Sequence, residues 1–211
     1  GINAEYGGKM KTTTYFTPSD IALHCTQSDL WVSKFGKVLD LTNVVRQAPS
    51  NLTESLIRAA GTDISSWFDS ARNDFPLLDN VLGQSYRLPY GLPMLHVDPK
   101  SEQAWWKDPK LVIGVVGKAR PLEILNTLTT HRHRFDVCEE ETLGEIAARY
   151  ARFNSNVLGY KWRFDGNDLK MDVNLTENGI RDERDVYLKL GWPEEQWYVP
   201  VITLVWKDQM V

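Results

Sequence analysis

Residues that could carry out catalysis are few in this chain of 211 residues. It has four histidines and two cysteines, and Cys25 and Cys138 are too far apart in sequence to form a metal-binding motif. No nucleophile–base pair, glycine-rich phosphate loop or Cys/His metal cluster can be recognised. We therefore expect a protein that is not an enzyme, with no catalytic residue and no small-molecule substrate, whose cysteines are reduced thiols in the cytoplasm.

The pair His131 and His133 is the one spacing that could bind a metal, because alternate residues of a strand share a face. Carboxylates at 139–141 could add to the pair, but a structural zinc site takes about four ligands. Arg132 and Arg134 flank the histidines and favour a surface hairpin. We expect no metal site here.

The composition limits the partners. The net charge is −4 and the isoelectric point about 5.6, so the protein has no broad attraction for nucleic acid or an anionic membrane. No stretch approaches the ~20 apolar residues that span a bilayer. Eight tryptophans stand out, because aromatic residues are enriched at protein interfaces. We expect protein partners, no nucleic acid and no membrane.

We treat residues 1–12 as an N-terminal extension and residues 13–80 as the first domain, of the α+β class. Thr17 can cap a short helix whose third residue is Asp20. Strands are predicted at 30–33 and 38–40, followed by two short helices.

The run from Gly36 to Thr42 reads G-K-V-L-D-L-T, and residues 60–65 read A-G-T-D-I-S. Both segments resemble the cytochrome b5 family, whose members carry G-K-V-Y-D-L-T and A-G-x-D-x-T. That resemblance implies a haem crevice with two axial histidines. One histidine belongs to a His-Pro-Gly-Gly motif, and the other lies a few residues beyond a phenylalanine that matches Phe68.

The two ligand positions fall on Ala48 and Asn73. Six-coordinate haem needs two strong axial donors, but alanine offers none and an asparagine amide is a poor ligand of iron. The resemblance therefore implies a degenerate domain with vestigial ligand positions and no haem cofactor. An alternative is haem held by an unusual ligand, such as His96, Tyr86 or Tyr90.

Residues 81–121 are rich in glycine and proline and are predicted to be a connecting arm. The arm is too aromatic for a flexible linker. It should pack against the crevice, the second domain or a partner, and a strand is possible near 111–116. We predict four of its residues as interaction residues: Tyr86, Tyr90, Trp105 and Trp106.

Residues 122–211 predict a hairpin, then a helix capped by Thr142 with Glu145, then further strands. The Asp165-Gly166 pair signals a tight turn. This order and the local sequence resemble the ubiquitin-like β-grasp fold, which implies a binding domain. The mixed-charge run at 181–185 is expected to be a solvated loop.

Both modules in this order resemble a family of cytochrome b5 domain-containing proteins. The resemblance implies a place in the cilium or flagellum, in the axoneme with its radial spokes, and a role in motility. We expect a non-catalytic structural subunit whose partners are other axonemal and radial spoke proteins. The alternatives are a haem-binding redox or sensor protein with a non-standard ligand, and an adaptor of the ubiquitin pathway.

Overall fold

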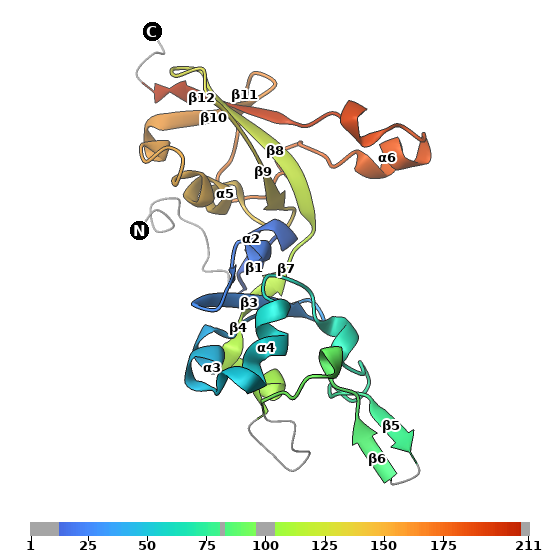
Figure 1. Ribbon diagram of the computed structural model, residues 1–211. Coiled ribbons are helices and arrows are strands. Elements are labelled where there is room, and N and C mark those ends of the chain that lie inside the picture. Colours follow the sequence, from blue (N-terminus) through green and yellow to red (C-terminus); the bar gives the residue numbers. More distant parts are fainter. Residues whose placement is uncertain (1–12, 81–82, 96–103, 208–211) are drawn as a thin grey trace. The chain divides into compact units, whose positions relative to one another are not determined.

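The computed structural model describes residues 13–80, 83–95 and 104–207. The chain forms two compact units, one spanning Thr13–Val116 and the other containing Gly117 and the residues that follow it. Figure 1 shows the helices and strands of both. The predicted class is confirmed: each unit combines a mixed sheet with short helices.

The first unit is built on a five-stranded sheet in the order β1-β7-β4-β3-β2. Its strands are β1 (Tyr15–Phe16), β2 (Cys25–Thr26), β3 (Asp29–Lys34), β4 (Lys37–Asp40) and β7 (Val112–Val116). The predicted pair β3 and β4 is antiparallel, with Val32 opposite Leu39. Strand β7 lies between β4, to which it is antiparallel, and β1, to which it is parallel.

Short helices complete this unit. They are α2 (Pro18–Ala22), α3 (Thr42–Gln47) and α4 (Ser50–Arg58), with one-turn 3₁₀ helices at Ser65–Trp67, Pro89–Gly91, Trp105–Lys107 and Pro109–Leu111. Helix α2 begins at the predicted cap, Thr17, which forms a capping box with Asp20: the Asp20 amide donates to the Thr17 hydroxyl, and the Asp20 carboxylate accepts from the Thr17 amide. A separate hairpin joins β5 (Leu77–Asn80) to β6 (Gly83–Tyr86).

The predicted connecting arm at 81–121 is not a connector in the structure. Its last part forms β7 inside the first sheet, and the first unit runs to Val116. Met94, Trp105 and Trp106 are buried in the same core as Leu56 of α4. The boundary predicted at residue 80 was therefore too early, because the glycines and prolines of this segment shape turns within a packed domain.

The second unit has the sheet order β11-β10-β12-β8-β9. Its strands are β8 (Ala119–Asn126), β9 (Arg132–Cys138), β10 (Tyr160–Phe164), β11 (Asn167–Asp168) and β12 (Val201–Trp206). β8 and β9 form the predicted hairpin, and β12 runs parallel to β8. Helix α5 (Leu143–Tyr150), capped as predicted by Thr142 with Glu145, adds Leu143, Ile146 and Ala147 to the core of this unit. A 3₁₀ turn at Val157–Gly159 precedes β10.

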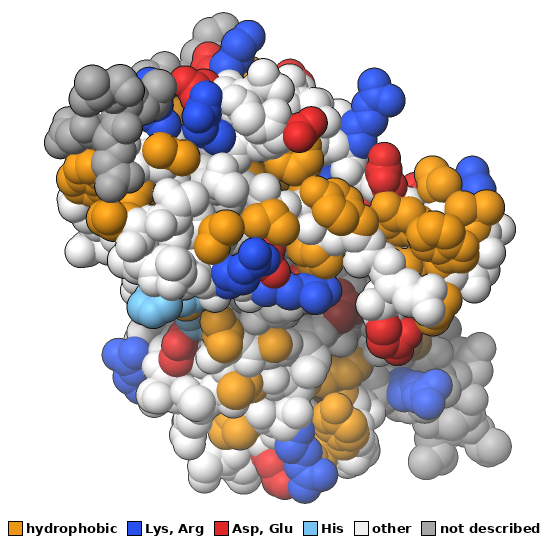
Figure 2. Space-filling model, turned by 90° about the horizontal axis from the view of Figure 1, so that it is seen from above, with side chains coloured by type: hydrophobic (Ala, Val, Ile, Leu, Met, Phe, Trp, Pro, Cys, Tyr) orange, Lys and Arg blue, Asp and Glu red, His pale blue; other side chains and the backbone are white. Residues whose placement is uncertain are grey.

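A projecting segment precedes β12. It contains α6 (Arg184–Lys189) and a 3₁₀ turn at Glu194–Gln196, and we call residues 183–199 the α6 lobe. No residue of α6, which is described in full, is buried. Figure 2 shows hydrophobic side chains gathered on the right, the side on which α6 lies in Figure 1. The segment predicted as a solvated loop therefore leads into a helix with an apolar surface.

Candidate functional site

The two positions where the resemblance places haem ligands lie in different settings. Ala48 is a half-buried residue with an extended backbone between α3 and α4. Asn73 is exposed in a turn with a φ of 52°. The Asn73 amide oxygen accepts a hydrogen bond of 2.7 Å from the ammonium of Lys34. Neither position presents a strong donor for iron.

Lys34 is the buried amine that engages Asn73. Only 4 % of this residue is exposed, and its ammonium also donates to the backbone carbonyl of Trp106 over 3.0 Å. The ammonium lies 4.1 Å from the centroid of the Phe68 ring, a cation–π geometry. Burial lowers the pKa of Lys34 to about 8. A cation paired with Asn73 and an aromatic face does not fit a site for axial coordination of haem.

Trp105 and Trp106 lie inside the first unit, with 2 % and 6 % of their surface exposed. The Trp106 ring meets Phe75 edge-on, with centroids 4.9 Å apart, and Phe75 stacks on Phe68 at 4.7 Å. This aromatic cluster shares its core with Val45 and Leu56 of the helical pair α3 and α4. The two tryptophans are therefore core residues of the first unit and not the interaction residues predicted for them, and the arm packs within this unit, as in the first of its three alternatives.

Of the other predicted residues of the arm, Tyr90 lies at the surface of the first unit. Tyr90 is 60 % exposed, with its ring centroid 6.0 Å from that of Trp67. The backbone of Tyr86 pairs with Leu77 in the β5–β6 hairpin. His96 lies outside the described residues. Tyr90 is therefore exposed, as an interaction residue must be, and its role as one stays a prediction.

The histidine pair of the second unit does not converge on a metal site. His133 stacks on Phe153 with ring centroids 4.6 Å apart, whereas His131 is exposed just before β9. Among the described residues, no group of three or more His, Cys, Asp and Glu side chains could hold a metal ion. His133 thus contributes to an aromatic contact on the surface of its unit.

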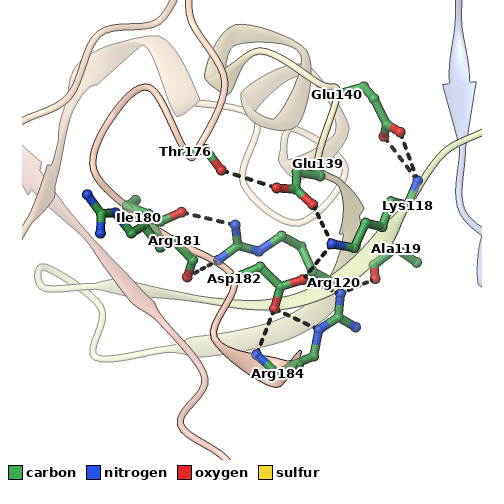
Figure 3. Close-up of polar contacts among 10 residues, drawn as sticks. All are labelled: Lys118, Ala119, Arg120, Glu139, Glu140, Thr176, Ile180, Arg181, Asp182 and Arg184. Atoms are coloured by element: carbon green, nitrogen blue, oxygen red, sulfur yellow. Dashed lines mark hydrogen bonds and ion pairs between the residues drawn. The ribbon is translucent and has the colours of Figure 1, made fainter. Parts of the chain in front are cut away.

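A buried arginine that sequence reasoning missed lies in β8 (Figure 3). Arg120 is only 2 % exposed, and its guanidinium donates to the carbonyls of Ile180 at 3.0 Å and Arg181 at 2.7 Å. Burial lowers its pKa. The signal was present in the sequence, because Arg120 is in phase with Leu122 and Ile124 on the inward face of the strand.

Further charged groups surround Arg120 at the base of the α6 lobe (Figure 3). Arg184 donates to both carboxylate oxygens of Asp182, at 2.9 and 2.7 Å, and to the Ala119 carbonyl at 2.7 Å. These bonds hold the pKa of Asp182 at about 2. The Lys118 ammonium pairs with Glu139 at 3.1 Å and lies 3.6 Å from Asp182. The chain that enters the lobe is therefore fixed to β8 by several charge-assisted bonds.

Beside this network is a cavity of about 180 Å³. Arg120, Asp182 and Tyr198 are among its lining residues, together with Phe164. It lies where the lobe leaves and rejoins the sheet of the second unit.

Aromatic side chains of the lobe contact one another, although none of them is buried. The rings of Tyr187 and Trp192 stack with centroids 5.5 Å apart at 6°. The Trp197 indole donates to the Trp192 carbonyl over 2.9 Å, and the Tyr187 hydroxyl is 2.8 Å from Glu183. These contacts order the lobe without burying its remaining apolar side chains.

The fold and the residues above define a two-domain protein, with a degenerate cytochrome b5-like unit followed by a ubiquitin-like β-grasp unit. No family model matches the sequence. A relative from Xenopus laevis, named Cytochrome b5 domain-containing protein 1, is 36% identical over 210 residues, which cover 93% of this chain and 95% of the relative. The chain belongs to the cytochrome b5 domain-containing protein 1 family.

Solved structures resemble each half of the chain. The cytochrome b5 of Ostreococcus tauri virus 2 is 24% identical with a TM-score of 0.30, covering 48% of this chain and 95% of that one. The solution structure of an N-terminal ubiquitin-like domain is 12% identical with a TM-score of 0.32, covering 45% and 81%. Within the described residues, no helix has the length and apolar character needed to cross a membrane.

Proposed function

We propose that this protein is a non-catalytic structural subunit of the ciliary axoneme, associated with radial spokes and needed for motility. One observation carries the non-catalytic part: the position expected to hold an axial ligand is Asn73, which accepts a bond from buried Lys34. The other position is Ala48, which has no donor side chain. The ciliary part rests on the family resemblance noted in the sequence.

The packing of the first unit supports the same proposal. A redox domain must leave room for its cofactor, whereas Trp105 and Trp106 here share a core with the helical pair α3 and α4. The first unit thus keeps a packed core, while the positions that hold axial haem ligands in the cytochrome b5 family are occupied by other residues. Such a body can serve in assembly, because folds are reused for functions that differ from those of their relatives.

Haem binding is tested by titrating the purified protein with haemin and recording the absorption spectrum, with a conventional cytochrome b5 as the control. We expect no sharp, stoichiometric Soret band. A stoichiometric band with b-type features that disappears in His96→Ala would overturn the non-catalytic proposal and favour the redox alternative.

Axonemal residence is tested by expressing the tagged full chain in ciliated cells and removing the ciliary membrane with detergent. We expect the protein to remain with the axoneme and to be depleted from axonemes that lack radial spokes. Complete release with the detergent-extracted fraction would contradict an axonemal role. Retention on spokeless axonemes would contradict the association with spokes.

A further inference from the structure

The α6 lobe presents an apolar surface over which no described segment of the chain packs. Of the ten large hydrophobic side chains exposed among the described residues, half lie in this lobe. They are Val186, Leu188, Leu190, Trp192 and Tyr198, each 49–60% exposed. Clustered exposure of this kind marks an interaction site, whereas single exposed hydrophobic residues are ordinary.

The lobe is ordered before it meets a partner. Tyr187 stacks on Trp192, and the Trp197 indole bonds to the backbone of Trp192. At its base, Arg120 and Arg184 bond to backbone carbonyls of neighbouring segments. A surface fixed in this way loses little conformational entropy on binding, which favours affinity from a small contact area.

The charges beside this surface are mostly negative. Residues 182–199 contain five carboxylates and two cations, and Asp182 and Arg184 are paired with each other. Glu194 and Glu195 are exposed on the 3₁₀ turn, and Asp185 is exposed on α6, where Lys189 is the remaining cation. An anionic lipid surface would be repelled, and a second copy of the lobe would bring carboxylates against carboxylates.

We propose that the α6 lobe binds an amphipathic helix of a partner protein, whose apolar stripe is flanked by lysine or arginine. Val186 and Leu190 are four residues apart and form a ridge of the kind that packs against a second helix. The basic flanks of the partner would lie beside Asp185, Glu194 and Glu195. The inference rests on the proposed function only in placing this partner in the axoneme.

The chemistry is tested with the full chain and two fluorescent designed helical peptides. Both carry the same leucine stripe, flanked by lysine in one and by glutamate in the other. Fluorescence anisotropy should show binding of the lysine peptide only. Val186→Gln with Leu190→Gln should weaken it by about tenfold or more, as expected when central apolar contacts are removed.

The matched control is Leu23→Gln with Leu128→Gln, which removes two leucines outside the lobe that are 66% and 51% exposed. It should bind the lysine peptide like the unaltered chain. Glu194→Lys with Glu195→Lys should shift the preference toward the glutamate peptide. Failure of the lysine peptide to bind, or equal binding by the lobe and control variants, would overturn the proposal.

Self-association is measured on the same proteins by analytical ultracentrifugation. We expect a monomer for the unaltered chain, the lobe variant and the control variant. A dimer that is lost in the Val186→Gln, Leu190→Gln variant would make a second copy the occupant and overturn the proposal.

Axoneme retention separates this inference from the proposed function. If the unaltered chain and the control variant are retained but the lobe variant is released, both are supported. If all three are retained equally, the lobe inference fails while the axonemal proposal stands. If the unaltered chain is not retained, the axonemal proposal fails, and the peptide measurements alone decide the binding chemistry of the lobe.

Discussion

Replacing Arg120 with methionine should destabilise the second unit and loosen the α6 lobe most. Methionine fills a similar space but cannot donate to the carbonyls of Ile180 and Arg181. A hydrogen bond that involves a charged group contributes about 1.5–3 kcal/mol, so the two together contribute about 3–6 kcal/mol. Removing a buried cation also relieves its desolvation cost, which leaves a net loss of about 2–4 kcal/mol.

Arg120→Met should increase hydrogen exchange more at residues 180–199 than in the rest of the second unit. The reason is that the two carbonyls belong to the chain that enters the lobe. Hydrogen exchange read by mass spectrometry measures both effects: peptides of the lobe should exchange much faster, and peptides of β12 moderately faster. Urea unfolding gives the change in stability of the unit. Each comparison is made at the same pH and temperature.

The control is Arg152→Met, which removes an exposed arginine that lies over the Phe153 ring. Its unfolding midpoint and exchange should change little, since exposed substitutions usually cost less than about 0.5 kcal/mol. If Arg120→Met unfolds and exchanges like Arg152→Met, the buried guanidinium does not hold the lobe, and the reasoning is refuted.

Three further predictions concern stability, each measured by urea unfolding against the unaltered chain. Trp106→Ala should cost the first unit about 3–5 kcal/mol, whereas exposed Tyr90→Ala should cost under about 1 kcal/mol; similar losses would contradict the core position of Trp106. Lys34 has a folded pKa of about 8 against 10.5 unfolded, so the unfolded state binds more protons between these values. The stability of the unaltered chain relative to Lys34→Met should therefore rise across this pH range, by up to about 3 kcal/mol, and a flat difference would count against the buried ammonium. Asp182 has a folded pKa of about 2 against 3.8, so its advantage over Asp182→Asn should be about 2 kcal/mol above pH 4 and be lost as the pH falls through 2; an advantage that is undiminished at pH 2 would point to another cause.

The local elements could be predicted because their signals lie within a few residues. The cap at Thr17 and the capping box at Thr142 form as expected. The turn at Asp165-Gly166 has positive φ at both residues, as a tight hairpin turn requires. The strand pair around Val32 and the helix α5 follow from their apolar periodicity.

The partners of distant segments could not be predicted from local patterns. Strand β7 pairs with β1, which lies about a hundred residues earlier in the sequence. A short apolar run can predict a strand, but it does not indicate the strand with which it pairs. The burial of Trp106 beside Phe75 depends on contacts between distant segments, so the sequence left open whether the tryptophans pack against the crevice, the second domain or a partner. In the α6 lobe the charges of 181–185 suggested a loop, yet two of them, Asp182 and Arg184, pair at its base.

The parallel pairing of first and last strands has a mechanical consequence in each unit. Tyr15 and Phe16 pair in parallel with Val115 and Val116, and β8 pairs in the same sense with β12. Tension along the chain pulls such strands past each other, so it loads their hydrogen bonds together in shear instead of opening them one by one. The ladder in the first unit joins two residue pairs and that in the second joins four. Under stretching, the first unit should yield before the second.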